Sequence, residues 1–384
     1  MFFVILSSVL TLMHLYVWKR VARDTTRPGR ARWALTGVVV GLGVLLVATL
    51  ILPRALDTPE PRWLAWLGYV WFGAVVYLVL ALLVLEPVRL ALRRWVRREP
   101  PAQEAPVVNR RLFLARASAA AAGATALGVT GFGVHTALSA PDVLRVPVTL
   151  RRLGAGFDGY RIAVVSDIHL GALLGRAHTE RIVRMINETE PDLVAIVGDL
   201  VDGSVDELGY AAEPLRDLVS RDGAFFVTGN HEYFVNDPPS WIRELDRLGV
   251  RSLQNESTVI RRGDAAFDLA GVNDIGGARF DEPPDFDRAL AAADPARPTV
   301  LLAHQPVLVD EAAARGVDLQ LSGHTHGGQT WPFHYAVRLV QPSLAGLSTF
   351  DDTQLYVTRG AGFWGPPLRV GAPPDISVLT LQGE

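Results

Sequence analysis

The sequence predicts an α/β protein in which helices cover two mixed sheets, preceded by a helical membrane region. Two observations lead to this prediction. Residues 142–384 alternate short β-branched apolar runs with stretches of helical spacing, a pattern typical of strands buried between helices. Residues 1–141 instead contain long uncharged apolar segments, of the length that crosses a bilayer. The chain therefore divides into a membrane region, residues 1–141, and an α/β domain, residues 142–384.

The membrane region has four candidate spans, at residues 1–18, 33–53, 63–85 and 117–140. The second and third are uncharged over 21 and 23 residues, enough to cross the hydrocarbon core. The first is short, and a signal peptide is the alternative, but the basic start of a signal peptide is absent. The fourth is rich in Ala and Gly, with a soluble helix or a linker as its alternative.

The loops between these segments predict the orientation. Loops 19–32 and 86–111 are rich in basic residues, whereas loop 54–62 is balanced. Basic loops stay in the cytoplasm, so the fourth segment would carry the chain out of the cell. We therefore expect a multi-pass protein of the cell membrane with an extracytoplasmic α/β domain. If the fourth segment does not cross, the domain stays cytoplasmic.

Composition excludes several classes of function. The chain of 384 residues contains no cysteine, which excludes disulfides, thiolate metal sites and cysteine nucleophiles. Residues 1–140 hold 16 basic and 6 acidic residues, and the remainder holds 21 basic and 34 acidic residues. An acidic domain argues against a general nucleic-acid-binding surface, so a nucleic acid partner is not expected. The sequence does not indicate an oligomeric state.

Other elements of the domain follow from periodicity and turn residues. An Arg262-Gly263-Asp264 turn predicts a hairpin between strands 258–262 and 265–270. The remaining expected elements are helices 179–188, 208–219, 240–248, 285–293 and 307–314, strands 355–358 and 376–381, and a loop at 99–108.

Five apolar runs, each of which reads as a buried strand, end in a polar cluster. Ligands bind outside the carboxyl ends of strands in open α/β sheets, so these clusters are expected to meet. The clusters are Asp167-Ile168-His169, Gly198-Asp199-Leu200-Val201-Asp202, Gly229-Asn230-His231-Glu232, Ala303-His304-Gln305 and Gly323-His324-Thr325-His326.

The clusters indicate a metal site, and a site for two ions is favoured. In an extended strand end, residues i and i+2 point the same way, so Asp167 and His169 can face one ion, and His324 and His326 repeat the spacing. Gly198 permits a sharp turn before Asp199, whose two carboxylate oxygens could bridge two cations. Imidazole and carboxylate suit transition metals and harder ions, respectively. The candidate ligands are Asp167, His169, Asp199, Asn230, His304, His324 and His326.

Each motif alone has an ordinary structural explanation. Asp-x-His and Gly-Asp-x-x-Asp also occur as turns and helix caps, and a lone His304 would more often be a satisfied polar residue. Together they are specific, because five of the nine histidines of the chain fall in these clusters, each just after an apolar strand.

In this order, the five clusters resemble the motifs of the calcineurin-like metallophosphoesterase superfamily. The resemblance covers residues 145–384 and implies a four-layer αββα sandwich. The stretches Gly323–Gln329, Val357–Gly362 and Arg369–Pro374 resemble the bacterial membrane-associated branch of the superfamily. Some members of that branch carry a twin-arginine leader, which the Arg110-Arg111 pair resembles.

The resemblance also implies roles for residues. One divalent metal ion (Mn, Fe or Zn) would bind Asp167, His169, Asp199 and His326, and a second would bind Asp199, Asn230, His304 and His324. His231 would contact the scissile phosphate or protonate the leaving group, and Asp202 would orient His231. Gly271–Asp274 resembles a family loop near the site, but Asn273 stands where an acid is expected, so no role is assigned to Asp274.

The predicted function is a membrane-anchored binuclear phosphoesterase. Two cations about 3.5–4 Å apart would share a hydroxide that attacks phosphorus in line. We expect a phosphodiesterase whose substrate is an envelope or lipid-linked phosphate ester. The alternatives are a metal-bound scaffold without activity and a regulatory domain on a membrane protein. The spans are almost free of charge, so they suggest no ion or proton pathway.

Overall fold

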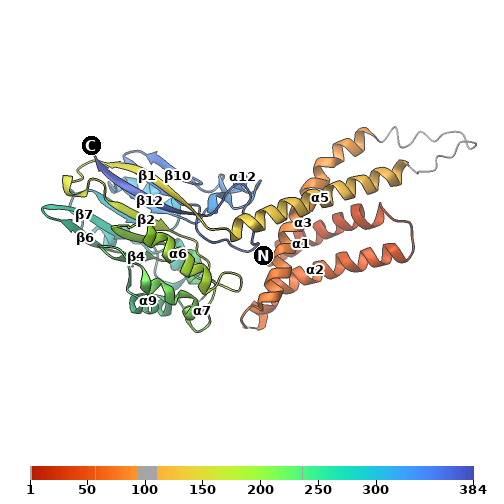
Figure 1. Cartoon of the computed structure of the whole chain (residues 1–384), viewed down its shortest axis with the longest axis horizontal. Coiled ribbons are helices and arrows are strands. Elements are labelled where there is room, and N and C mark those ends of the chain that lie inside the picture. Colours follow the sequence, from red (N-terminus) through yellow and green to blue (C-terminus); the bar gives the residue numbers. More distant parts are fainter. Residues whose placement is uncertain (1, 57, 93–109, 236) are drawn as a thin grey trace, which may run out of the picture. The chain divides into compact units, whose positions relative to one another are not determined.

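The computed structural model describes residues 2–56, 58–92, 110–235 and 237–384, in two compact units (Figure 1). One unit contains the helices up to His135 together with Gly365–Leu368. The other contains Thr136–Trp364 and Arg369–Glu384 and is the α/β domain. The loop predicted at 99–108 lies outside the described residues.

Among the residues that the structure describes, the helical unit contains four helices. They are α1 (Phe2–Val17), which continues as the π-helical segment η1 (Trp18–Arg23), α2 (Arg30–Leu56), α3 (Arg62–Ala91) and α5 (Arg110–Leu138). In the described part of the chain, three helical stretches, 30–53, 62–91 and 110–138, are long and apolar enough to cross a membrane. They indicate a membrane protein. Helix α1 has 16 residues, fewer than the roughly 20 that a span needs. The span expected at residues 1–18 therefore stays a prediction.

Four charged side chains of this unit pair with one another. Arg20 lies 2.8 Å from Glu86, and Asp24 accepts hydrogen bonds from Arg20 and Arg89. Next to this cluster, the hydroxyl of Tyr16 donates to Glu86. Pairing lowers the cost of holding these charges in a partly buried position.

The α/β domain contains two six-stranded mixed sheets, as the sequence predicts. The first has the order β1-β12-β2-β3-β4-β5, in which only the β12–β2 pair is antiparallel. The second has the order β10-β11-β9-β8-β7-β6, with antiparallel pairs at both edges. The strands are β1 (Asp142–Leu150), β2 (Arg161–Val165), β3 (Leu193–Val197), β4 (Ala224–Val227), β5 (Val250–Ser252), β6 (Glu256–Arg262), β7 (Ala265–Gly271), β8 (Thr299–Leu302), β9 (Leu319–Ser322), β10 (Gly346–Phe350), β11 (Thr353–Val357) and β12 (Asp375–Gly383).

Alternation along the strands builds four layers. On β2, Ile162 and Val164 pack into the core between the sheets, whereas Ala163 and Val165 pack under the helices outside. Residues of α6 and α9 cover the first sheet, and residues of α10 and α11 cover the second. The helices are α6 (Arg176–Glu188), α7 (Val205–Ala212), α8 (Asn230–Phe234), α9 (Pro238–Arg247), α10 (Phe286–Leu290), α11 (Val309–Ala314) and α12 (His334–Val337), with short 3-10 turns η2 (Ala155–Phe157), η3 (Glu213–Asp217), η4 (Ile275–Phe280), η5 (Pro306–Leu308) and η6 (His326–Gly328).

The structure confirms the β6–β7 hairpin and corrects two helices. The helix expected at 208–219 is α7 followed by the 3-10 turn η3, because Pro214 cannot continue the hydrogen bonding of an α-helix. The helix expected at 285–293 is shorter, Phe286–Leu290. Strands β1, β5 and β10 were not expected, and β10 is a strand with no fully buried residue.

Candidate metal centre

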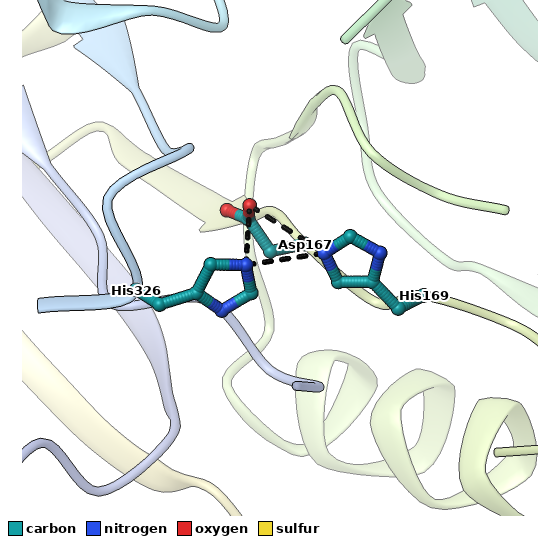
Figure 2. Close-up of side chains that lie close together, drawn as sticks. All are labelled: Asp167, His169 and His326. Carbon is teal, nitrogen blue, oxygen red and sulfur yellow. Dashed lines mark hydrogen bonds and ion pairs between the residues drawn. The ribbon is translucent and has the colours of Figure 1, made fainter. Parts of the chain in front are cut away.

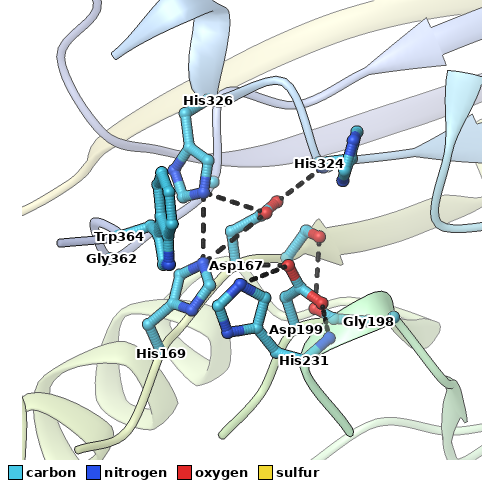
Figure 3. Close-up of polar contacts among 12 residues, drawn as sticks. Asp167, His169, Gly198, Asp199, His231, His324, His326, Gly362 and Trp364 are labelled. Atoms are coloured by element: carbon cyan, nitrogen blue, oxygen red, sulfur yellow. Dashed lines mark hydrogen bonds and ion pairs between the residues drawn. The ribbon is translucent and has the colours of Figure 1, made fainter. Parts of the chain in front are cut away.

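The five polar clusters converge where the two sheets meet. Clusters after β2, β3 and β4 come from adjacent parallel strands of the first sheet, and those after β8 and β9 come from adjacent parallel strands of the second. Figure 3 shows side chains from four of these clusters gathered together, among them Asp167, Asp199, His231 and His326. Three groups bring ligand atoms within 4.8 Å of one another, namely Asp167 with His169 and His326, His169 with Asp199 and His231, and Asp199 with His304 and His324.

The first group, shown in Figure 2, brings three predicted ligands around one point. The Nε2 atoms of His169 and His326 are 3.1 Å apart. The Nε2 of His326 is 3.2 Å from Oδ1 of Asp167, and the Nε2 of His169 is 3.9 Å from the same oxygen. Atoms that bind one cation at 2.0–2.2 Å lie roughly 3–3.6 Å apart, so the spacing suits a shared ion.

The group of Asp199, His304 and His324 is oriented by a hydrogen bond from His304 to the backbone. The Nδ1 of His304 donates to the carbonyl of Val197 at 2.7 Å, which turns its Nε2 toward Asp199 Oδ2, 3.3 Å away. A histidine held in this way presents the lone pair of its other nitrogen. Oδ2 of Asp199 also lies 3.9 Å from the Nε2 atoms of His169 and His231, so Asp199 connects all the groups.

Both buried carboxylates use one oxygen for the backbone and turn the other toward the histidines. Oδ2 of Asp167 accepts from the amide of His324 at 3.0 Å, and Oδ1 of Asp199 accepts from the amide of His231 at 2.9 Å. The hydrogen bonds fix each carboxylate in a single orientation. The remaining oxygens face the centre of the site.

Three buried polar atoms in the site have no hydrogen-bond partner. They are Oδ1 of Asp167, Oδ1 of Asn230 and Nε2 of His304. An unpaired buried polar group costs on the order of 1–3 kcal/mol, so native proteins rarely leave several together. All three are predicted ligand atoms, and divalent cations would satisfy them at once. The residues therefore fit a metal centre.

The backbone at the ligands is strained. Asp167, His169, Asp199, His324 and His326 all have positive φ angles, between 49° and 69°. The expectation that these residues continue an extended strand is wrong, because the left-handed conformation redirects each side chain. His324 and His326 accordingly fall in different groups and do not face one point. Such strain concentrates at functional sites.

Two acids outside the ligand set hold the loops together. The carboxylate of Glu232 accepts from the amides of Gly229, Asp199 and Leu200, which ties the loop after β3 to the loop after β4. Oδ1 of Asp202 accepts from Nδ1 of His231 at 2.6 Å and from Nδ1 of His169 at 2.9 Å. Asp202 therefore orients His231, as predicted, and also orients His169.

Charge within the site is tuned by burial and proximity. Burial raises the pKa of Asp167. Burial opposes ionisation of Asp199 too, but His304 and His231 hold its pKa well below the usual range. Burial by itself would lower the pKa of His231, yet Asp199 and Asp202 raise it to about 9. Burial and His304 lower the pKa of His324 to about 4, so His324 is neutral near pH 7 and keeps a lone pair for a ligand role.

Arg369, to which the sequence assigned no role, supports the group of Asp167, His169 and His326 through contacts with His326. It is fully buried. Its Nη1 donates to the carbonyls of His326 and Arg359 at 2.9 Å, and its Nε donates to the carbonyl of Gly362 at 3.0 Å. Its Nη2 lies 3.1 Å from Nδ1 of His326. Its planar guanidinium thus joins two loops, the one after β9 and the one between β11 and β12, a geometry that lysine cannot reproduce.

The Asn273-Asp274 pair lies beside the ligands but outside the three groups. Asp274 is fully buried and accepts from Nε2 of Gln305 at 2.9 Å and from the amide of Gly276 at 2.7 Å. Asn273 donates to the carbonyl of Glu282. Because Gln305 follows His304, Asp274 fixes the loop that carries this histidine.

Comparison with known proteins matches this site to one family. The family model described as calcineurin-like phosphoesterase matches residues 160–328. The chain is 40% identical over 258 residues to a Bos taurus transmembrane protein with metallophosphoesterase domain, across 64% of this chain and 58% of that protein. It is 34% identical over 228 residues to an uncharacterized metallophosphoesterase of Aquifex aeolicus, across 58% of this chain and 85% of that protein. It thus spans about 58% of the length of the vertebrate relatives.

Proposed function

Because the chain belongs to the calcineurin-like metallophosphoesterase family, we propose that it is a membrane-bound, metal-dependent phosphoester hydrolase. The observation that carries the proposal is the convergence of three unpaired buried ligand atoms with closely spaced imidazoles from both sheets. Leaving several buried polar atoms without hydrogen-bond partners costs stability, so we infer that this arrangement has a catalytic or binding role.

We assign two divalent cations to the site. Asp167, His169, Asp199 and His326 would hold one, and Asp199, Asn230, His304 and His324 would hold the other, with Asp199 shared. The spacing within the groups and the orphaned oxygen of Asn230 support this division. The ligands suit Mn, Fe or Zn alike. Such cations supply a water nucleophile of lowered pKa and neutralise charge on the phosphoryl oxygens.

His231 and Asp202 act beside the ligands. His231 is 11% exposed at its side chain and lies at the edge of the site, where its Nε2 can meet a bound phosphate. Asp202 holds Nδ1 of His231, so the proton on Nε2 is available to a phosphoryl oxygen or a leaving group. Electrostatic stabilisation of phosphoryl transfer needs no covalent nucleophile.

The finer proposal is a phosphodiesterase acting on an envelope or lipid-linked substrate. Its support is the set of apolar helices on the same chain, which would hold the domain beside a membrane. We further propose that the chain crosses the membrane several times and that α5, which begins at Arg110-Arg111, carries it out of the cytoplasm. The twin-arginine resemblance of this pair and the basic loops before α5 support that orientation.

The test is hydrolysis by the purified full chain in detergent micelles. Bis(p-nitrophenyl) phosphate and p-nitrophenyl phosphate serve as diester and monoester probes, after chelation and refilling with Mn, Fe or Zn, beside His231→Ala. We expect diester hydrolysis that returns with metal and is lost in the variant. Two bound metal equivalents without turnover of either probe would instead identify a scaffold without activity.

A further inference from the structure

One exposed run of apolar side chains in the α/β domain follows directly after the site. Trp331, Phe333 and Tyr335 are 51%, 56% and 60% exposed, and Leu339 and Val340 are 86% and 70% exposed. Helix α12, within this run, has no buried residue. Large apolar side chains concentrated on a surface in this way mark an interaction site. We refer to residues 331–340 as the Trp331–Val340 surface.

This surface is joined to the metal centre through Trp364. The side chain of Gln329, three residues after His326, accepts from the amide of Trp364 at 3.0 Å and donates to its carbonyl at 2.8 Å. The Trp364 ring stands 6.2 Å from the ring of His231, nearly perpendicular to it, and is half exposed (Figure 3). A second exposed aromatic ring, Phe234, lies 5.1 Å from His231. The rim of the site is therefore apolar on the side that Trp364 occupies.

Charge distinguishes the surface from the rest of the domain. Residues 319–350 contain no Asp or Glu, although residues 141–384 carry 34 acids against 21 basic residues. Arg338 lies within the surface, between Tyr335 and Leu339. Exposed Trp and Tyr next to a basic residue, without acids, suit the headgroup region of a bilayer that contains anionic lipids.

The α/β domain follows a candidate membrane span directly in the chain, which would hold the domain near a bilayer. Helix α5 is apolar enough to cross a membrane, and only Ser139–Pro141 separate its end from β1. Three residues span at most about 10 Å, so β1 begins close to the end of that helix. A second copy of the chain is a poorer occupant, since stable protein interfaces use roughly 20–30 residues a side and this run has ten.

We propose that the Trp331–Val340 surface inserts into the headgroup region of a lipid bilayer and presents bilayer-embedded phosphate esters to the metal centre. The proposal rests on the phosphoesterase function argued above. It deepens that function by locating the surface that receives a lipid substrate. The aromatic rim of Trp364 and Phe234 then contacts the apolar part of the substrate while its phosphate reaches His231.

The absence of cysteine allows a direct test. Leu339→Cys places a single thiol on the surface for an environment-sensitive fluorophore, and Val219→Cys, at a position 67% exposed between η3 and β4, is the matched control. Each labelled full chain is reconstituted in nanodiscs of phosphatidylcholine and phosphatidylglycerol, with and without doxyl-labelled phosphatidylcholine as a quencher in the lipid. We expect lipid-borne quenching at position 339 and none at 219. Adding Trp331→Ser and Phe333→Ser to the first variant should weaken that quenching.

Equal exposure of both labels to a water-soluble quencher, without lipid-borne quenching, would overturn the proposal. Protection at 339 that depends on protein density and not on doxyl lipid would overturn it in favour of a second copy. Metal-restored hydrolysis of bis(p-nitrophenyl) phosphate by the same labelled chains separates the two hypotheses. Hydrolysis of the probe without lipid-borne quenching would refute only the proposal of membrane insertion. Lipid-borne quenching without hydrolysis would refute the phosphoesterase function and leave a surface that binds lipid.

Discussion

At the scale of single residues, the site depends on groups that sit behind the ligands. One oxygen of Asp202 receives the Nδ1 protons of both His169 and His231. Each imidazole ring is thereby held with its Nε2 toward the centre of the site. One carboxylate thus serves both the proposed metal ligand and the proposed phosphate contact.

Replacing Asp202 with Asn is expected to lower kcat/KM for the diester probe by about 10–100-fold, the usual effect of losing a partner of a metal-bound histidine. The amide oxygen of Asn carries no negative charge, so it is a weaker acceptor for both Nδ1 protons, and the charge that helps to raise the pKa of His231 is lost. Kinetics and metal affinity by chelator competition measure the effect.

Asp206→Asn is the control, since Asp206 is an exposed acid in the first turn of α7. It should leave both quantities unchanged. Wild-type kinetics and metal affinity in Asp202→Asn would show that the two hydrogen bonds do not orient the histidines.

At the scale of elements, the loops after the strands are the functional parts. Each begins at a buried strand, and those after β2, β3 and β9 bend through left-handed residues, among them Asp167, Asp199 and His324, which redirect the side chains. Gly198 allows the loop after β3 to approach the loops after β4 and β8 closely. A Cβ there would lie 2.6 Å from Nδ1 of His304 and 2.7 Å from the amide of Gly229.

We therefore expect Gly198→Ala to displace His304 and reduce diester hydrolysis by about 100-fold, because a shift near 1 Å in a catalytic group has an effect of that size. Gly159→Ala is the matched control. Gly159 has a similar φ of 79°, against 86° for Gly198, but a Cβ there would have no neighbour within 4 Å. Both variants carry the same backbone strain, of about 1–2 kcal/mol. Equal activity in the two would contradict the steric explanation.

At the scale of the whole molecule, the site links the two sheets. Its ligands come from loops after β2, β3 and β4 on one side and after β8 and β9 on the other. Without cations, the orphaned atoms and the buried carboxylates of Asp167 and Asp199 destabilise the junction. Binding of cations to the folded state alone would stabilise the domain.

Removal of metal should lower the unfolding temperature of the full chain by about 5–10 °C, since saturation at 100 times Kd is worth about 2.7 kcal/mol and each kcal/mol moves Tm by about 2–4 °C for a domain of this size. Thermal scans at one scan rate, with chelator and after refilling with Mn, Fe or Zn, measure the change. His304→Ala, which removes a ligand, should lose most of the response. An unchanged Tm on refilling would contradict a cation that cross-links the sheets.

Periodicity and spacing were enough to predict the class of fold and to place polar clusters at the ends of strands that meet. Strands such as 161–166 and 193–197 are predicted by near-continuous apolar runs rich in β-branched residues, and each run is followed by a polar cluster. The short strands β5 and β10 were missed because three residues, or a half-exposed run, leave too weak a pattern. A proline at 214 was the available signal for the end of α7.

The sequence by itself determined which residues can bind metal, because ligand chemistry is a property of the side chain. Only the tertiary structure decided how these residues divide between the groups: the backbone is left-handed at His324 and at His326, and the two side chains fall in different groups. Tertiary structure also brought in Arg369 and Glu232, whose partners are backbone groups distant in the chain. Backbone amides and carbonyls are the same at every position, so a sequence cannot indicate which of them a buried charge will meet.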